Sequence, residues 1–247
     1  MELKGKSALI TGGGTGLGRA IVLLLAKEGV NVAVNYSRSK DDAEKTAADA
    51  RALGVKAITV QADVSSAASV ENMAAETEKA FGRLDILVNN AGTTKFVPFK
   101  DLDGLDEEDW LKIFRTNTMS VFFASRAAAK IMKKSGGGRI ISTVSNAGLR
   151  PSGSSIAYSV SKAAGIHVTK CLAVALAPEI SVNAIAPGLL LTRWHTATSP
   201  EQVAKIKESA VLHKEVNIEE CAAMYIALIK NDNITGQTIT VDSGIVI

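Results

Sequence analysis

The sequence contains no long apolar run, few aromatic side chains (4%), two cysteines and three histidines. No segment approaches the roughly 20 apolar residues of a membrane-spanning helix, and the N-terminal apolar segment is too short for a signal peptide. Cys171 and Cys221 lack CxxC spacing and fall in predicted helices, so we expect reduced thiols in the core. His167, His195 and His213 lack metal-ligand spacing, which argues against a metal site. We therefore expect a soluble, cytoplasmic protein without a metal ion or a membrane contact.

Strong charge and a hydrolase motif are lacking as well. The net charge is +3 and no basic run exceeds two or three residues, so nucleic acid is not an expected partner. The segment Gly153-Ser154-Ser155 lacks the closing glycine of the G-x-S-x-G nucleophile elbow. Hydrolase chemistry therefore has no support.

Short apolar runs alternate with helix-length segments along the whole chain. The runs are 7–11, 31–35, 56–60, 84–88, 139–144, 180–185 and 237–241, and the helical segments are 17–28, 41–53, 66–80, 107–133, 156–177 and 217–229. Strands that alternate with helices form parallel βαβ units, and continuously apolar strands are buried on both faces. The pattern predicts one domain over 1–247, an α/β fold with a doubly wound, seven-stranded parallel sheet and helices on both faces. Ser65 is a candidate N-cap of the third helix, and Asp106 with Asp109 marks the start of the fourth.

The stretch TGGGTGLG, residues 11–18, joins the first strand to the first helix and contains five glycines. Glycine inside regular structure costs roughly 0.5–1 kcal/mol relative to alanine, so the bare backbone should serve a purpose. A helix N-terminus offers free N–H groups to an anion, and missing side chains would let a pyrophosphate approach. The spacing is T-G-x-x-x-G-x-G rather than G-x-G-x-x-G. A flexible connector is the alternative, but the strand–turn–helix context favours a nucleotide site.

Further motifs follow the ends of the predicted strands. Asp63-Val64 follows the third strand, Asn89-Asn90-Ala91-Gly92 the fourth, Ser145 the fifth and Pro187-Gly188 with Thr192 the sixth, while Asn117 lies in the fourth helix and Tyr158-x-x-x-Lys162 in the fifth. With the glycine-rich turn, this ordered set resembles the short-chain dehydrogenase/reductase family along nearly the whole chain, and especially its 3-oxoacyl carrier-protein reductases. The resemblance implies a Rossmann fold and an oxidoreductase that interconverts a ketone and a secondary alcohol.

The spacing of Tyr158 and Lys162 also has a chemical meaning of its own. Residues four apart on a helix share one face, with Cβ atoms about 5–6 Å apart. A tyrosine with a pKa near ~10 exchanges protons poorly at neutral pH, and a nearby ammonium lowers that pKa. We therefore predict that Tyr158 is the general acid/base.

Three further residues complete the predicted catalytic set. Ser145 would hold the same substrate oxygen, although Ser142 and Thr143 are near rivals in the sequence. By resemblance, Lys162 would also bind the nicotinamide ribose, and Asn117 would anchor a water-linked proton path.

The end of the second strand bears on the choice of cofactor. By resemblance, the carboxylate that binds the adenosine ribose of NAD would stand at the position of Tyr36. Because this chain has no carboxylate there, a 2′-phosphate would not be repelled. Arg38 can pair with that phosphate bidentately and Ser37 can donate a hydrogen bond, so NADP(H) is the expected cofactor. A solvated Arg38 is the alternative. The other expected contacts are Gly12, Gly14, Thr15, Gly16, Leu17 and Gly18 in the turn, Asp63 and Val64 at the adenine, Asn90, Ala91 and Gly92 along the ribose, Tyr158 and Lys162, and Pro187, Gly188, Leu190 and Thr192 near the carboxamide.

A segment of about 25 residues after the sixth strand, about 189–214, is the predicted substrate lid because it fits neither strand nor repeat. Its apolar residues Leu189 to Leu191 and Trp194, with Thr93-Thr94 and the 146–155 loop, would bound a pocket for an apolar ketone. Packing of the leucines on the domain body is the alternative.

Substrate and assembly stay open at this stage. Carrier-protein reductases commonly present basic residues where this chain has 135–138 and 178–179, so a small ketone or alcohol is at least as favoured as an oxoacyl carrier protein. A nucleotide-binding sensor without turnover is a third possibility. The apolar C-terminus and the long fourth and fifth helices would form interfaces by resemblance, which predicts a homotetramer, with a dimer as fallback.

Overall fold

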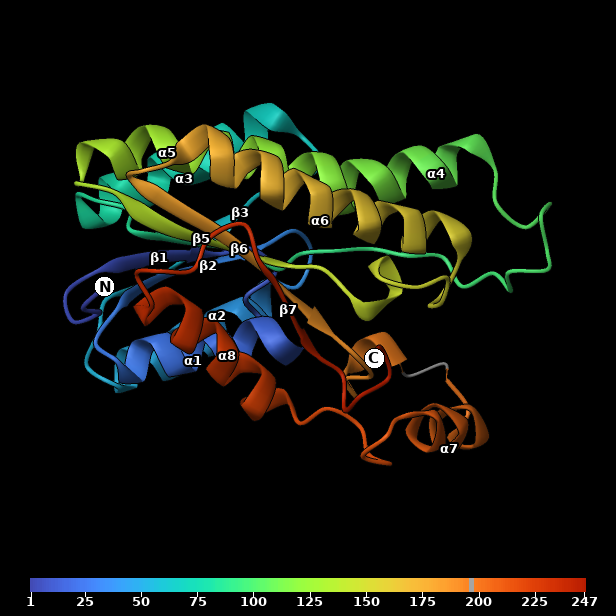
Figure 1. Cartoon of the computed structure of the whole chain (residues 1–247). Coiled ribbons are helices and arrows are strands. Elements are labelled where there is room, and N and C mark those ends of the chain that lie inside the picture. Colours follow the sequence, from blue (N-terminus) through green and yellow to red (C-terminus); the bar gives the residue numbers. More distant parts are fainter. Residues whose placement is uncertain (196–197) are drawn as a thin grey trace.

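Parallel strands form one sheet that organises the fold. The computed structural model describes residues 1–195 and 198–247, and within them seven strands pair in the order β3-β2-β1-β4-β5-β6-β7 (Figure 1). The strands are β1 Ser7–Ile10, β2 Asn31–Tyr36, β3 Ala57–Gln61, β4 Ile86–Asn89, β5 Gly138–Thr143, β6 Ile180–Pro187 and β7 Thr238–Val241. The predicted doubly wound parallel sheet is confirmed. Its strand order reverses between β1 and β4, where ligands bind in open sheets of this kind.

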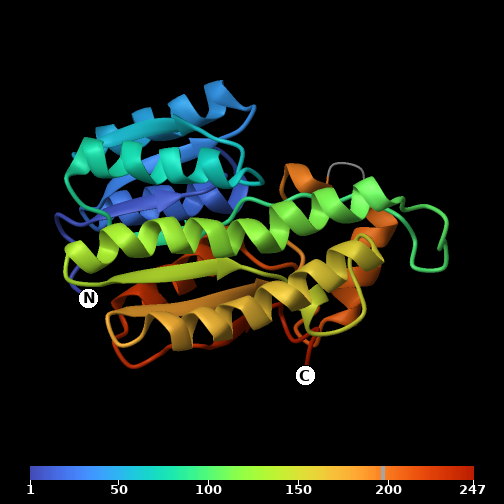
Figure 2. The same ribbon diagram turned by 90° about the horizontal axis from the view of Figure 1, so that it is seen from above.

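Helices cover both faces of the sheet. One face carries α1 Gly16–Lys27, α2 Lys40–Ala52 and α8 Ile218–Lys230, and the other carries α3 Ala67–Phe81, α5 Ser120–Lys134 and α6 Ile156–Leu176 (Figures 1 and 2). Helix α4 Glu107–Phe114 continues through a π-helical turn, η1 Arg115–Met119, directly into α5. The 3₁₀ turns η2 Asn146–Gly148 and η3 Arg193–His195 and helix α7 Pro200–Ser209 complete the described elements. Within the described residues, no helix combines the length and apolar character needed to cross a membrane.

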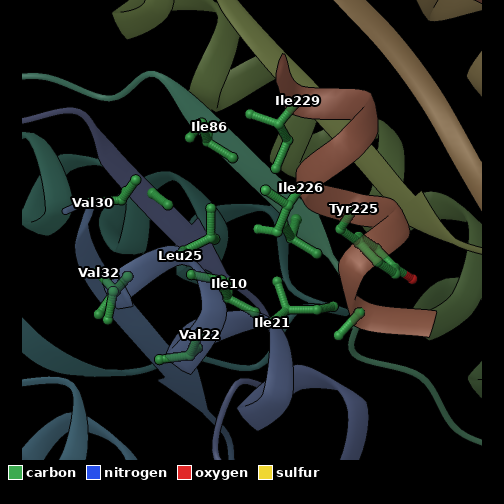
Figure 3. Packing of buried hydrophobic residues seen from close by; sticks show 14 of the residues in the cluster. Ile10, Ile21, Val22, Leu25, Val30, Val32, Ile86, Tyr225, Ile226 and Ile229 are labelled. Atoms are coloured by element: carbon green, nitrogen blue, oxygen red, sulfur yellow. The ribbon is translucent and has the colours of Figure 1, made fainter. Parts of the chain in front are cut away.

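Two large apolar clusters fill most of the space between the sheet and the helices. In the first, Ile10 of β1 packs with Ile21 and Leu25 of α1 and with Ile226 of α8 (Figure 3). The second lies under α3, α5 and α6 and includes Leu9 of the same strand. Successive side chains of a strand point to opposite faces, so neighbouring residues enter different clusters. This double burial explains why the strands are continuously apolar.

One of the two helix starts named from the sequence is confirmed and the other is wrong. Asp106 Oδ1 accepts a hydrogen bond of 2.8 Å from Asp109 N, and the Asp109 carboxylate accepts one from Asp106 N. Helix α3, however, is capped by Ser66, whose Oγ accepts a 3.3 Å hydrogen bond from the helix. Ser65 instead donates through both N and Oγ to Asp63 Oδ1. This local turn takes the Ser65 hydroxyl and moves the cap by one residue.

The predicted lid contains more regular structure than expected. Helix α7 begins with a capping box, because Ser199 Oγ accepts from Gln202 N at 3.3 Å and Gln202 Oε1 accepts from Ser199 N at 3.1 Å. Pro200 occupies the first helical turn. A serine, a proline and a glutamine at this spacing are themselves a helix-start signal. Residues 196–197 of the predicted lid lie outside the described residues.

The two cysteines differ in environment. Cys221 is a buried free thiol in α8, as predicted. Cys171 is also free but exposed, so its predicted burial is wrong. Helix α6 turns Leu172 and Ala173 toward the core, which leaves Cys171 on the outward side of the helix together with the highly exposed Val174.

Candidate active site

A cavity of about 860 Å³ opens beyond the ends of six strands. Its walls come from residues within the segments 12–18, 35–39, 62–65, 90–93, 143–145 and 187–194, although Gly13, Leu189 and Leu191 do not line it, together with residues of α4, η1 and α6. Every residue predicted to contact the cofactor lines this cavity, and Ser145 lines it with them. Asn117 is not among the lining residues. The fold thus gathers widely separated motifs in one place, while the role of each residue stays a prediction.

The glycine-rich turn needs its bare backbone for two different reasons. Gly12 and Gly16 have φ angles of +62° and +51°, a region that side chains disfavour. A Cβ atom on Gly14 would lie 3.0 Å from the amide nitrogen of Ala43 in α2, and one on Gly18 would overlap the Gly12 carbonyl oxygen. These glycines therefore shape the turn and let it pack against its neighbours, which leaves its outer side open to the cavity.

The N-terminus of α1 forms part of the cavity wall. Thr15 occupies the N-cap position, but its side chain accepts no hydrogen bond from the helix, and the first turn carries no acidic residue. Gly16, Leu17 and Gly18 of this turn line the cavity. Uncapped N–H groups and the positive end of the helix dipole favour an anion there. The turn is therefore suited to a pyrophosphate.

Polar side chains of neighbouring strands hold the turn through hydrogen bonds. Thr11 Oγ1 accepts hydrogen bonds from the backbone nitrogens of Asn90 (2.8 Å) and Ala91 (3.0 Å). Asn90 Nδ2 donates to the carbonyl oxygens of Thr11 (3.1 Å) and Gly12 (3.2 Å). Asn35 Oδ1 accepts from Gly12 N at 3.2 Å. Asn35 was not predicted to have a role, although a polar asparagine within an apolar strand is a signal that the sequence offers.

The β2 edge of the cavity contains hydrogen-bond donors and a cation. Tyr36, Ser37, Arg38 and Ser39 line it in succession, with no carboxylate among them. The nearby carboxylate of Asp63 accepts two hydrogen bonds from Ser65. The hydroxyl groups and the guanidinium of residues 36–39 suit a phosphate at the adenosine end better than a free ribose hydroxyl.

Tyr158 and Lys162 face the same cavity from the first turns of α6. Ser155 caps this helix through a 3.3 Å hydrogen bond that its Oγ accepts from Tyr158 N. Lys162 Nζ lies 5.6 Å from the centre of the Tyr158 ring and donates a 3.0 Å hydrogen bond to the Thr143 carbonyl oxygen. Ser145 Oγ accepts from Ala147 N at 3.1 Å.

Burial sets the protonation of both groups. It raises the pKa of Tyr158, and a hydrogen bond with Ser145 only partly opposes this rise. It lowers the pKa of Lys162 to about 8. The prediction that the ammonium makes the phenol more acidic is therefore wrong for the protein alone. Desolvation of the phenolate by burial is the larger cause, and the hydrogen bond with Ser145 is the smaller, opposing one.

Asn117 occupies the π-helical turn η1 and supports the wall of the cavity from behind. Its Oδ1 accepts from Thr93 N at 2.8 Å, and its Nδ2 donates to Thr93 O at 2.9 Å and to Ser161 Oγ at 3.0 Å. The side chain is thus occupied in fixing Thr93, which lines the cavity. Single π turns inside α-helices are frequent at functional sites. The sequence pattern, which predicts one helix over 107–133, did not reveal this turn.

The lid segment adds an aromatic wall next to the catalytic candidates. The Trp194 ring lies 6.1 Å from the Tyr158 ring at an interplanar angle of 55°. Leu190 lines the cavity, Leu189 is buried and Leu191 is exposed, so the leucines divide between the pocket, the body and the surface. Thr94 does not line the cavity, and its hydroxyl pairs with Ser154 Oγ at 2.5 Å.

The sequence model that describes short chain dehydrogenases matches residues 6–203. This chain belongs to the short-chain dehydrogenase family. It is 37% identical over 243 residues to the 3-oxoacyl-(acyl-carrier-protein) reductase FabG of Staphylococcus epidermidis, which covers 97% of this chain and 98% of the relative. It is 38% identical over 224 residues to versicolorin reductase 1 of Aspergillus parasiticus, covering 90% of this chain and 82% of the relative.

Solved structures of other proteins share the whole fold. A short-chain dehydrogenase from Burkholderia cenocepacia in complex with NADP matches with a TM-score of 0.92 and 35% identity, covering 99% of both chains. The NADPH-dependent 3-quinuclidinone reductase from Rhodotorula rubra matches with a TM-score of 0.91 and 32% identity, covering 99% of this chain and 92% of the other. As a member of this family, the protein is an oxidoreductase with a Rossmann fold.

Proposed function

We propose that this short-chain dehydrogenase is an NADP(H)-dependent ketoreductase that interconverts a ketone and a secondary alcohol. The observation that carries the proposal is the convergence of Tyr158, Ser145 and Lys162 on the cavity that the glycine-rich turn also lines. The similarity to FabG, to versicolorin reductase 1 and to the quinuclidinone reductase supports the ketone as substrate class.

The proposed cofactor fits the residues of the cavity. The volume of about 860 Å³ is at the large end for small-molecule sites. The first turn of α1 would receive the pyrophosphate, while Ser37 and Arg38 would bind the 2′-phosphate. The NADP complex of the Burkholderia relative supports this choice. When bound, NADP(H) supplies or accepts the hydride, and the protein provides orientation and proton transfer.

Tyr158 is proposed as the proton donor in the reductive direction. Because burial raises its pKa, the phenol stays protonated at neutral pH, which is the form that can donate to a ketone oxygen. Lys162, with a pKa of about 8, is mostly an ammonium at pH 7 and lies 5.6 Å from the ring. Its positive charge would stabilise the phenolate that remains after proton donation.

Ser145 is proposed as the second hydroxyl on the substrate oxygen. Its rivals have other partners: Ser142 is fully buried and its Oγ accepts from Asn89 Nδ2, and the Thr143 hydroxyl pairs with Tyr225. Ser145 faces the cavity and forms a hydrogen bond with Tyr158 that favours the phenolate. Asn117 is proposed as a positioning residue, because its side chain holds Thr93 in the wall of the cavity.

An apolar ketone is the favoured substrate, and an oxoacyl group on a carrier protein is the second candidate. Trp194 and Leu190 give the substrate end of the cavity an apolar wall, which suits the first. The identity with FabG over nearly the whole chain favours the second. Lys133 and Lys134 at the end of α5 are basic residues near the segment 135–138, and Lys134 is already paired with Glu78.

We also propose that the enzyme is a homotetramer. Large apolar side chains are exposed along the outer faces of α4, η1, α5 and α6, namely Trp110, Leu111, Met119, Phe122, Val160 and Val174. Exposed apolar side chains of this number on one layer of helices are typical of an interface between subunits. Light scattering of the purified protein should give four times the mass of one chain.

The function is tested by following NADPH oxidation against a panel of small ketones and one oxoacyl thioester. Tyr158→Phe should reduce turnover by roughly 100- to 10,000-fold while leaving the NADPH affinity nearly unchanged, since only the proton donor is lost. Full turnover by this variant would refute the assigned role. NADPH binding without oxidation on any compound would favour a nucleotide sensor.

A further inference from the structure

Tyr225 of α8 places a hydroxyl group inside the first apolar cluster. The residue is fully buried, and Figure 3 shows its ring beside Ile226 with the oxygen directed away from the aliphatic side chains. That oxygen lies 2.7 Å from Thr143 Oγ1, at the end of β5. Burial keeps the pKa of Tyr225 well above its usual range, so the phenol retains its proton. The hydroxyl of a fully buried tyrosine that reaches another element needs a physical explanation.

The hydrogen bonds around this pair are compatible with one arrangement of protons. Asn90 Nδ2 donates to two backbone carbonyl oxygens, those of Thr11 and Gly12, which only accept. This orients the amide so that its Oδ1 faces Thr143 Oγ1, at 3.3 Å. Thr143 must therefore give its only hydroxyl proton to Asn90, and so Tyr225 donates to Thr143. The chain of donors runs from Tyr225 through Thr143 and Asn90 to the glycine-rich turn.

Thr143 also contacts the catalytic candidates through its backbone. Its carbonyl oxygen accepts the 3.0 Å hydrogen bond from Lys162 Nζ. Thr143 thus contacts Lys162 through its carbonyl oxygen and Asn90 through its hydroxyl. We propose that Tyr225 is a positioning residue, which acts through Thr143 and Asn90 to hold the glycine-rich turn in the conformation that binds the dinucleotide pyrophosphate.

This inference rests on the proposed NADP(H) site. The turn contains two positive-φ glycines, and Asn90 ties it to β4 and β5 through its side-chain amide. Without a donor to its Oδ1, that amide can rotate and release the carbonyl oxygens of Thr11 and Gly12. The cofactor would then have to order the turn on binding, which lowers its affinity.

The test compares Tyr225→Phe, Thr143→Val, the double variant and Thr143→Ser with the wild type. Thr77→Val is the control for the loss of a threonine hydroxyl, because the Thr77 hydroxyl is buried and donates to Met73 O in α3, outside the cavity. NADPH affinity is measured by fluorescence titration without substrate, and melting temperature without cofactor. Thr143→Val should weaken NADPH binding by about three- to tenfold, the equivalent of one hydrogen bond. Tyr225→Phe should weaken it by about threefold, and Thr143→Ser should bind as the wild type does.

The double variant provides the decisive comparison. Since Tyr225 acts through Thr143, the double variant should bind NADPH with the same affinity as Thr143→Val, with no further loss. Thr77→Val should lower the melting temperature with no change in affinity. Wild-type affinity in Tyr225→Phe, or fully additive losses in the double variant, would overturn the proposal.

A failure of the proposed function would look different. The wild type itself would then not bind NADPH, whereas the melting temperatures would still report on the hydroxyl chain. Thr143→Val should be less stable than the double variant, because it leaves the Tyr225 hydroxyl buried without an acceptor. The reverse order would refute the proposed direction of the hydrogen bonds.

Discussion

Replacing the buried lysine with an apolar side chain of similar length should stabilise the fold while abolishing activity. Lys162 is 5% exposed, and burial lowers its pKa from 10.5 to about 8. At about 1.4 kcal/mol per tenfold change in proton affinity, the folded state disfavours the ammonium by roughly 3 kcal/mol. Lys162→Met removes that penalty and also removes the hydrogen bond to the Thr143 carbonyl oxygen, at a cost of about 1 kcal/mol. The variant should therefore gain about 2 kcal/mol.

The gain should depend on pH in a defined direction. Between pH 8 and 10.5 the unfolded chain binds a proton at Lys162 that the folded chain has released, so wild-type stability rises with pH in this window. The advantage of Lys162→Met is complete below about pH 8 and shrinks through the window. Above pH 10.5 only the lost hydrogen bond remains, so the variant should then be less stable than the wild type by about 1 kcal/mol. The sign follows from a folded-state pKa that is lower than the unfolded-state value.

Thermal unfolding of the cofactor-free protein at fixed concentration measures this effect. For a chain of this length, about 2 kcal/mol corresponds to a rise in melting temperature of about 4–8 °C at pH 7. Lys170→Met, an exposed lysine of the same helix, is the matched control and should show no rise. A lower melting temperature for Lys162→Met, or a difference from wild type that does not vary with pH, would refute the reasoning. A residue that is required for activity can lower the stability of the fold, and Lys162 is expected to be such a residue.

Two further variants test the ends of the cavity. Arg38→Glu should weaken NADPH binding by about 10- to 100-fold, as expected for the loss of a hydrogen bond to a charged group, and should leave NADH binding unchanged or improved. An unaltered preference between the two cofactors in KM measurements would contradict the assignment of Arg38. Trp194→Ala should raise the KM for apolar ketones by about tenfold or more through the loss of apolar contact, with the NADPH affinity little changed. Equal losses for small polar and apolar ketones would show that Trp194 does not form the substrate wall.

Local patterns in the sequence determined much of the fold and the composition of the site. Continuous apolar runs are a direct consequence of strands buried on both faces, and the capping box at Asp106 depends on residues three apart. The four-residue spacing places Tyr158 and Lys162 on one helix face whatever surrounds them. Within any such element, geometry follows from neighbours in the chain, so spacing alone is sufficient.

The tertiary structure decided the properties that depend on residues distant in the sequence. The pKa of Tyr158 rises rather than falls because several elements together desolvate the phenol. Gly14 is bare because α2 approaches it, and Cys171 is exposed because α6 turns its neighbours inward. The pairing of Tyr225 with Thr143 joins residues 82 positions apart. Desolvation and close packing arise only when separate elements meet, and no local spacing encodes them.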